Sequence, residues 1–126
     1  MDQDLYDKGM KIRREVLGDA YVDAALAATD PSAQEFQAFV TDRAWGEWAR
    51  PGLGRRERSL LTIGVLAALG RTEELAHHFR GAARNGLTDE ELDESLRHLA
   101  AYAGIPAALA ARRALDAARR SDPTRG

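Results

Sequence analysis

Hydrophobic and polar residues recur with a helical period along most of this 126-residue chain, and no segment shows the two-residue alternation of a half-buried strand. Glycine and proline divide the pattern into segments. These segments lie at about residues 2–17, 31–49, 55–69, 72–85, 88–103 and 106–120. Residues 21–28 are either a further short helix or part of a loop. The sequence therefore predicts an all-α fold of about six helices.

Residue types at the helix ends define three of these boundaries more closely. Thr72 has a side chain suited to an N-cap, and Asn85 with Gly86 predicts a left-handed stop at the end of the same helix. Thr88 and Glu91 have the spacing of a capping box, in which each side chain accepts a hydrogen bond from the other residue's backbone. The next helix is therefore expected to begin at this pair.

The segment 55–69 is the most hydrophobic of the predicted helices. It begins with RRER and continues as SLLTIGVLAAL, which is apolar nearly all the way round. This pattern is typical of a helix buried on most faces, so we expect it at the centre of the fold. A chain of this length forms one hydrophobic core. We expect a single domain over residues 1–126, with a solvated tail from about residue 121.

Composition and charge exclude several classes of function. The chain has no cysteine, which excludes disulfides, cysteine zinc sites and thiol peroxidase chemistry. Its formal net charge of −2 gives no general attraction to nucleic acid or an anionic membrane, and the short RRER run is balanced by acids. The N-terminus lacks the apolar centre of a signal peptide, and no window approaches a membrane span. We expect a cytoplasmic protein with no nucleic-acid or membrane partner.

Two adjacent histidines interrupt the helical pattern in EELAHHFRGAARNG, residues 73–86. Adjacent residues on a helix lie about 100° apart. By this geometry His78 shares the apolar stripe of the helix, while His77 lies with Arg80 and Gly81 toward a more polar side. Histidines that diverge in this way cannot both bind one ion without distortion, so we expect no metal site.

Several segments together resemble the 4-carboxymuconolactone decarboxylase family of aromatic degradation. They are GMKIRREVLGDAYVD at 9–23, AWGEW at 44–48, RPGLGRRERSLLTIGVLAALGR at 50–71, EELAHHFRGAARNG at 73–86 and YAGIPAALAA at 102–111. The resemblance implies an all-helical subunit, a ring-like homo-oligomer that is commonly a hexamer, and decarboxylation without a cofactor in the β-ketoadipate pathway. Related alkylhydroperoxidase-like proteins carry a C-x-x-C motif just before the histidine. This chain has RTEELAHH there, so that chemistry is excluded.

The substrate implied by the resemblance is a dianionic unsaturated lactone. When CO2 leaves the ring carbon next to the ring oxygen, the electrons flow through the ring double bond into the lactone carbonyl. Protonation next to that carbonyl then gives the 3-oxoadipate enol-lactone. Because the ring is its own electron sink, we expect no cofactor and no metal. The protein must supply positioning, cationic groups for the carboxylates and one proton donor.

His78 is the first candidate for the proton donor, because it lies on the inward stripe and matches the family's histidine. Glu74, one turn earlier, has the spacing to orient and support an imidazolium. The alternative is that His78 is a core histidine bonded to a backbone carbonyl or to Glu74. We interpret His77 as a solvated neighbour and His98 as a packing or interface residue.

Glu47, in AWGEW, matches an acid of the family and is flanked by two tryptophans that could shield it from water. A carboxyl group in such a setting has a raised pKa and could exchange a proton near neutral pH. The alternative is an ion pair between Glu47 and Arg43 one turn earlier. Tyr102 either lines the same pocket or only packs there.

Arginine can hold a carboxylate of the substrate through two parallel hydrogen bonds. Arg58 is the first candidate, because apolar residues follow it along one stripe of the central helix, whereas Arg55 and Arg56 belong to its exposed first turn. Arg13 and Arg14 match an arginine pair of the family, and they could reach a pocket at a subunit boundary. For each arginine the alternative is a surface or structural ion pair.

Overall fold

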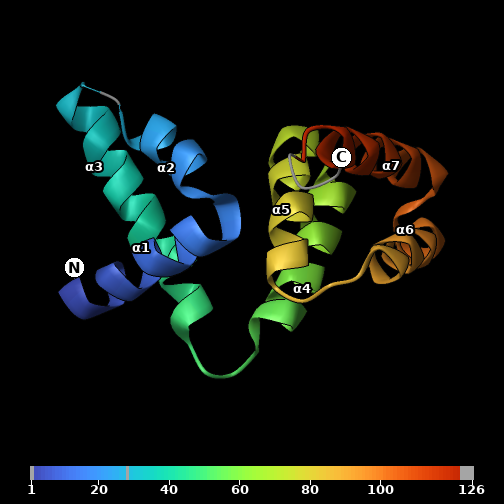
Figure 1. Cartoon of the computed structure of the whole chain (residues 1–126), viewed down its shortest axis with the longest axis horizontal. Helices are drawn as coiled ribbons and strands as arrows, with labels where there is room; N and C mark the ends of the chain where they lie inside the picture. The colour runs from blue at the N-terminus through green and yellow to red at the C-terminus, as the bar shows by residue number, and fades with distance from the viewer. Residues whose placement is uncertain (1, 28, 123–126) are drawn as a thin grey trace. The chain divides into compact units, whose positions relative to one another are not determined.

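Helices make up nearly all of the described chain in the computed structural model, which describes residues 2–27 and 29–122 (Figure 1). The α-helices are α1 (Gln3–Leu17), α2 (Asp19–Leu26), α3 (Pro31–Val40), α4 (Arg55–Leu69), α5 (Thr72–Arg84), α6 (Asp89–Ala103) and α7 (Ile105–Arg120). A π-helical turn, Thr41–Trp45, and a 3-10 turn, Glu47–Ala49, follow α3. No strand occurs within these ranges, which confirms the predicted all-α class. Because α2 forms a helix of its own, the described residues contain seven α-helices rather than about six.

The helices group into two compact units that divide between Gly54 and Arg55. The N-terminal unit contains α1 to α3 and the two short turns, and the C-terminal unit contains α4 to α7. Each unit has its own cluster of buried hydrophobic residues. None of the described helices combines the length and the apolar character that crossing a membrane requires.

In the N-terminal unit, α1 packs against α2, the π-helical turn and the 3-10 turn. Its start is capped by Asp2, whose carboxylate accepts hydrogen bonds from the backbone N–H groups of Asp4 and Leu5 at 3.0 and 3.3 Å. The buried residues of the cluster are Ile12, Val16 and Trp45. The core of this unit therefore joins the middle of α1 to the π-helical turn.

The helix expected at 31–49 is not continuous, which corrects that prediction. Regular α-helical geometry ends at Val40, and the Gly46 N–H then donates to the Thr41 carbonyl, five residues back, at 3.0 Å. The facing helix α1 approaches the turn closely at Gly9. A β carbon at Gly9 would lie 2.8 Å from the Gly46 nitrogen and 2.9 Å from the Thr41 carbonyl oxygen. The wider π turn thus lies where the backbones of the two elements meet.

In the C-terminal unit, α4 and α7 each contact the other three helices. The side chains at the centre of its core are Leu75 and Leu115, which are 0% and 1% exposed. Short connections join consecutive helices, so α4 and α5 form an antiparallel hairpin. This hairpin carries the two adjacent histidines.

Most of the predicted helix ends are confirmed in this unit. Gly86 has a φ of 91°, and the capping box forms: the Thr88 N–H donates to Glu91 at 3.0 Å and the Glu91 N–H donates to Thr88 at 3.1 Å. The N-cap of α5 is one residue earlier than predicted, because Thr72 is already helical and Arg71 occupies the cap without a side-chain hydrogen bond.

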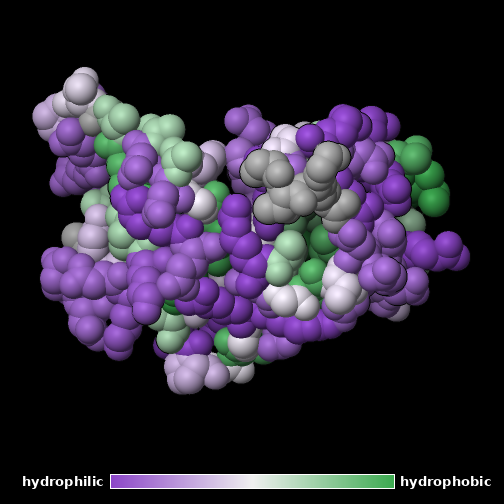
Figure 2. Space-filling model, in the orientation of Figure 1, coloured by the Kyte–Doolittle hydropathy of each residue, from purple (hydrophilic) through white to green (hydrophobic). Residues whose placement is uncertain are grey.

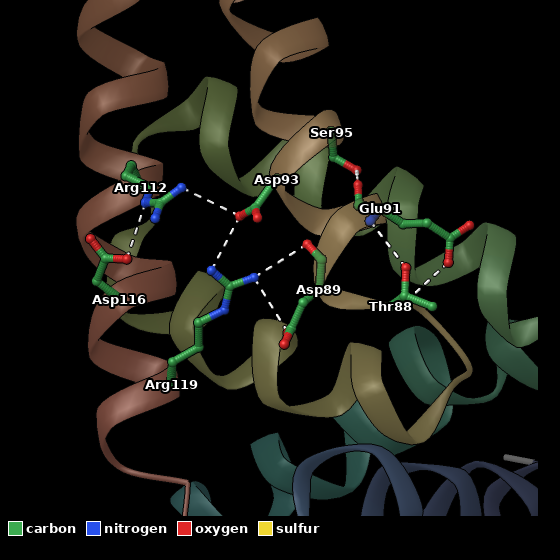
Figure 3. Close-up of polar contacts among 8 residues, drawn as sticks. All are labelled: Thr88, Asp89, Glu91, Asp93, Ser95, Arg112, Asp116 and Arg119. Carbon is green, nitrogen blue, oxygen red and sulfur yellow. Dashed lines mark hydrogen bonds and ion pairs between the residues drawn. The ribbon is translucent and has the colours of Figure 1, made fainter. Parts of the chain in front are cut away.

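A network of arginines and aspartates joins α6 to α7 (Figure 3). Arg119 donates to Asp93 at 3.1 Å and to Asp89 at 3.3 Å. Arg112 donates to the same Asp93 oxygen at 3.3 Å and to Asp116, on its own helix, at 3.0 Å. Because Arg119 is mostly buried while the carboxylates are partly solvated, the network orients the two helices more than it stabilises them.

The helix α4 is not buried on most faces, which corrects the prediction for residues 55–69. Its Leu61, Val65 and Leu69 are 60%, 49% and 65% exposed, because the other three helices of the unit cover only its opposite side. Figure 2 shows a mainly hydrophilic face with a hydrophobic area at the right edge, over the junction of α6 and α7, where Ile105 and Leu109 are exposed. Such apolar surfaces favour a further contact.

The close approach at Gly9 gives a test of this packing. We expect Gly9→Ala to lower the free energy of unfolding by about 1–3 kcal/mol, because the added methyl group meets backbone atoms that cannot move aside. Gly64 in the middle of α4 is the matched control, since a β carbon there meets nothing within 4 Å. We expect Gly64→Ala to be neutral or stabilising by up to about 1 kcal/mol. Equal effects of the two changes on thermal unfolding would contradict this description.

Candidate active site

His78 lies in the middle of α5, next to the fully packed Phe79, and is itself half-buried. Burial, together with a smaller effect of the neighbouring His77, lowers its pKa from 6.5 to about 4. His78 is therefore neutral at neutral pH. The inward placement predicted for it agrees with this degree of desolvation.

His77 has a different environment on the same helix. Its Nδ1 lies within hydrogen-bond distance of the Arg80 guanidinium, which also donates to the Ser121 hydroxyl at 2.9 Å. Burial and Arg80 lower the pKa of His77, and the acids of the first turn oppose them. The polar side assigned to His77 is less open than predicted, because Gly81 is buried.

Glu74 is exposed, and its charge partly opposes the lowering of the His77 pKa. The influences on the pKa of His78 are burial and His77. The expected support of a His78 imidazolium by Glu74 is therefore not part of this arrangement.

Arg58 and His78 lie on the same two-helix hairpin but at different levels. The hydrogen bond from Asn85 Nδ2 to Ser59 Oγ, at 2.7 Å, sets the register of α4 against α5. Arg58 precedes Ser59, so its backbone lies near the C-terminal end of α5. His78 is seven residues before Asn85, which corresponds to roughly 10 Å along the helix axis. Arg58 is half-buried and lies about one helical turn before Leu61, at the start of the exposed apolar stripe of α4.

Arg13 and Arg14 lie in the N-terminal unit, and both have partners there. Arg13 is 4% exposed and donates to the Thr41 hydroxyl and the Gln37 amide oxygen. Arg14 is half-buried and pairs with two aspartates of α2 at 3.1 and 2.9 Å, which raises its pKa. For both residues this chain supplies the structural interactions that the sequence left as an alternative.

Glu47 is exposed rather than shielded by tryptophans, which corrects the predicted enclosure. Trp45 is buried and stacks on Trp48 with ring centroids 5.2 Å apart. The Glu47 side chain is 60% exposed and pairs with Arg50 at 3.3 Å, not with the expected Arg43. Arg43 lies instead over the ring of Phe39, 5.7 Å from its centroid. In this single chain, Glu47 is open to solvent.

Tyr102 lines a wide groove of about 590 Å³ between α4 and α6. It is 81% exposed and packs against the ring of His98, with centroids 5.0 Å apart. Arg56 lines the same groove and pairs with Glu91, while Glu94 adds a second carboxylate. Because its acids outnumber its one arginine, the groove is an unfavourable place for a dianion.

The sequence predicts Arg56 in the exposed first turn of its helix, whereas in the structure Arg56 lines this groove. Arg56, Leu60 and Gly64 share one stripe of α4, and their four-residue spacing could have indicated it. Within the described part of the chain, no three potential metal-binding side chains of histidine, aspartate or glutamate lie together.

The fold and this set of residues can be compared with known proteins. A family model described as the carboxymuconolactone decarboxylase family matches residues 34–117. The chain belongs to this family. It is 48% identical over 111 residues to a 4-carboxymuconolactone decarboxylase from Acinetobacter baylyi, which covers 87% of this chain and 83% of that protein. The resemblance described from the sequence is thereby confirmed.

Two further relatives differ in their printed activities. The chain is 44% identical over 108 residues to a nitrosuccinic acid decarboxylase from Metarhizium robertsii, covering 85% of this chain and 76% of that protein. It is 48% identical over 42 residues to a 4-carboxymuconolactone decarboxylase from Pseudomonas putida, covering 33% of this chain and 88% of that sequence. The family therefore includes at least two named decarboxylase activities.

The matched region divides the candidate residues. It contains His78, Glu74, Arg58, Glu47 and Tyr102, whereas Arg13 and Arg14 precede it. The first three lie on the α4–α5 hairpin, with Arg58 roughly 10 Å from His78 along the helix axis, and this hairpin is the candidate active site.

The lowered pKa of His78 predicts a pH dependence of stability. Between about pH 4 and pH 6.5 the unfolded chain protonates this histidine while the folded chain leaves it neutral, so stability rises with pH across that window. We expect His78→Gln to flatten the rise of the unfolding midpoint between pH 4.5 and pH 7. His98→Gln, which replaces an exposed histidine of α6, is the control against which the change in slope is measured. An unchanged slope in His78→Gln would show that His78 titrates near its ordinary pKa.

Proposed function

We propose that this chain decarboxylates 4-carboxymuconolactone to the 3-oxoadipate enol-lactone, a step of protocatechuate degradation in the β-ketoadipate pathway. The observation that carries the proposal is its 48% identity, over 87% of the chain, to a protein with this name. The hairpin is consistent with it, because a desolvated histidine and an arginine lie on adjoining helices. We assign the enzyme to the cytoplasm.

The reaction needs little from the protein beyond charge, shape and one proton. The bond between the ring carbon and its carboxylate breaks, and the electron pair moves through the ring double bond to the lactone oxygen. A proton then adds to the carbon next to the carbonyl. Arg58 has the chemistry to hold a carboxylate, and His78 the chemistry to supply the proton. The lactone serves as the electron sink, so the proposal includes neither metal nor organic cofactor.

The protonation state of His78 links binding to catalysis. The unliganded histidine is neutral at neutral pH, because its pKa is about 4. A dianion bound within about 4–6 Å favours the imidazolium and raises that pKa. Binding of the substrate would therefore let His78 take up from water the proton that it later donates, without help from Glu74.

A second candidate substrate is nitrosuccinate, because a relative 44% identical over 85% of the chain is named for it. The two acids share a chemical feature. In each, one carbon carries a carboxylate, a carboxymethyl arm and a group that accepts electrons, which is the unsaturated lactone in one acid and the nitro group in the other. Loss of CO2 from that carbon leaves a dienolate or a nitronate, so one site could hold the shared substituted-succinate part.

The test is CO2 release from freshly generated 4-carboxymuconolactone, with nitrosuccinate assayed in parallel. We expect the lactone to be consumed faster, and the activity to survive exhaustive chelation. If the protein consumes nitrosuccinate and not the lactone, nitrosuccinate is the substrate and the first proposal is wrong. Loss of activity on chelation with recovery on adding one divalent metal would refute the mechanism.

The two histidines supply a matched pair of variants. We expect His78→Ala to lower turnover by about 10²–10⁴-fold, as is typical for loss of a general acid, while the oligomer persists. His77→Ala should have a much smaller effect, and Arg58→Ala should weaken substrate binding and turnover together. The opposite ranking of the two histidines would mean that the helix faces are assigned the wrong way round. If neither matters, Glu47 or Tyr102 becomes the candidate donor.

We also propose that the enzyme is a homo-oligomer, most simply a hexameric ring. The support is the exposed apolar stripe of Leu61, Val65 and Leu69. A single exposed leucine is ordinary on a protein surface, whereas three large apolar side chains on successive turns of one helix form a continuous patch. A specific interface on this stripe would bury more than about 1,000 Å².

Light scattering should therefore give a mass several times the 13.8 kDa of one chain. Val65→Asp, which places a charge in the middle of the stripe, should shift the population to smaller species. Glu90→Gln, at an exposed position at the start of α6, should not. A monomer at micromolar concentration would refute this proposal.

A further inference from the structure

The N-terminal unit contains a π-helical turn, Thr41–Trp45, directly after α3. Such turns are rare, occur mostly as single turns within helices, and are frequent at functional sites. A π turn contains one residue more than an α turn, so every residue after it is rotated by about 100° relative to a continuous α-helix. Here the π turn is followed by Gly46 and then by Glu47 and Trp48 of the 3-10 turn.

One side chain bonds to both sides of the point where the α-helix becomes the π turn. Arg13 of α1 donates from one guanidinium nitrogen to the Thr41 hydroxyl at 3.0 Å and from the other to the Gln37 amide oxygen at 2.8 Å. The Thr41 hydroxyl in turn donates to the Gln37 carbonyl at 3.1 Å. The guanidinium thus bonds to the last turn of α3 and to the first residue of the π turn.

The environment of Arg13 is unsuited to holding a substrate carboxylate in this conformation. Its side chain is 4% exposed, and both terminal nitrogens are engaged by neutral oxygen atoms. Burial is the main cause of its lowered pKa. Burying a cation is unfavourable unless its hydrogen bonds are well placed, and the planar fork of arginine can reach two acceptors that a lysine ammonium cannot reach together.

The same helix fixes the turn from a second point. Gly9 lies one helical turn before Arg13, and its Cα faces the backbone of the π turn at Thr41 and Trp45. Two contacts from α1, one steric and one through hydrogen bonds, therefore hold this turn. Beyond it, Trp45 stacks on Trp48, and the exposed Glu47 lies between them in sequence.

We propose that Arg13 is a positioning residue that holds the π register of Thr41–Trp45, and thereby sets the direction of Glu47 and Trp48, without binding substrate itself. This replaces the substrate-binding role expected from the sequence. The spectroscopic test of the proposal is independent of the proposed function. Its kinetic test rests on that function and on a contribution of Glu47 to it.

The two tryptophans of the chain are Trp45 and Trp48, so tryptophan spectra report on this segment alone. We expect Thr41→Val, which removes only the hydroxyl, and Arg13→Met to change the near-ultraviolet circular dichroism and the emission maximum of the stacked pair. Thr41→Ser should preserve both signals, and Arg13→Lys should not restore them. Arg14→Met is the matched control, because Arg14 pairs with α2 and should leave the tryptophan signals unchanged.

The kinetic test separates positioning from substrate binding. If Arg13 acts through Glu47, Thr41→Val and Arg13→Met should lower kcat by about 10–100-fold with KM within a factor of two. Combining Arg13→Met with Glu47→Gln should then lower kcat no further than the larger single effect. A substrate anchor would instead raise KM, and its effect would multiply with that of Glu47→Gln.

Each outcome decides the proposal. Unchanged tryptophan spectra in Thr41→Val and Arg13→Met, or a raised KM with unchanged spectra, would overturn it. If Arg13→Met does not fold, Thr41→Val carries the same test, because valine matches threonine in size. If the wild-type protein does not decarboxylate either acid, the proposed function fails, and the spectra still decide whether Arg13 holds the turn.

Discussion

The burial of one stripe of α5 is the constraint on which the candidate site depends. Leu75 and Ala82 are 0% exposed and Phe79 is 2% exposed, since α4 and α7 pack against this helix. These contacts fix the rotation of α5 about its axis. His78 lies three residues after Leu75 and four before Ala82, so it shares their buried face of the helix. Its lowered pKa follows mainly from this burial, and His77 acts in the same direction.

The arginines show how one residue type serves different purposes in the same chain. Arg119 and Arg112 share the carboxylate of Asp93 and orient α6 against α7 at a partly solvated surface. Arg13 is buried among neutral acceptors and bonds to a backbone irregularity. Arg58 is half-buried at the start of the exposed apolar stripe of α4, and its role as a substrate anchor is part of the proposal. The burial and the partners of each arginine, rather than the residue type, distinguish these cases.

The helical period predicted the class and most boundaries of the fold, because it reports local geometry. The capping box of Thr88 and Glu91 and the stop at Gly86 were predictable for the same reason. The π turn was not, since it depends on the close approach of α1 at Gly9, more than thirty residues away in sequence. Local pattern cannot report such a contact.

The candidate site divides along the same line. The inward face of His78 followed from adjacent residues of one helix, and the structure agrees with it. The predicted enclosure of Glu47 required tertiary neighbours that the sequence does not specify. The support predicted from Glu74 rested on spacing along one helix, and spacing alone does not establish that the two side chains meet. The apolar character of α4 was identified correctly, but the single chain buries only one side of it. Composition indicates that a surface is apolar, and not what covers it.

The electrostatics of a half-buried histidine suit a decarboxylation in which the substrate supplies the electron sink. Burial makes the imidazolium a stronger acid, because desolvation favours the neutral ring. A dianionic substrate acts in the opposite direction and lets the ring take up a proton from water. Once CO2 has left, the negative charge moves from the lost carboxylate to the lactone oxygen. In the proposed mechanism, transfer of the proton from His78 to carbon then cancels one charge and returns the histidine to the neutral state that its apolar surroundings favour. The proposal therefore asks one environment both to admit the proton when substrate binds and to release it when the product forms.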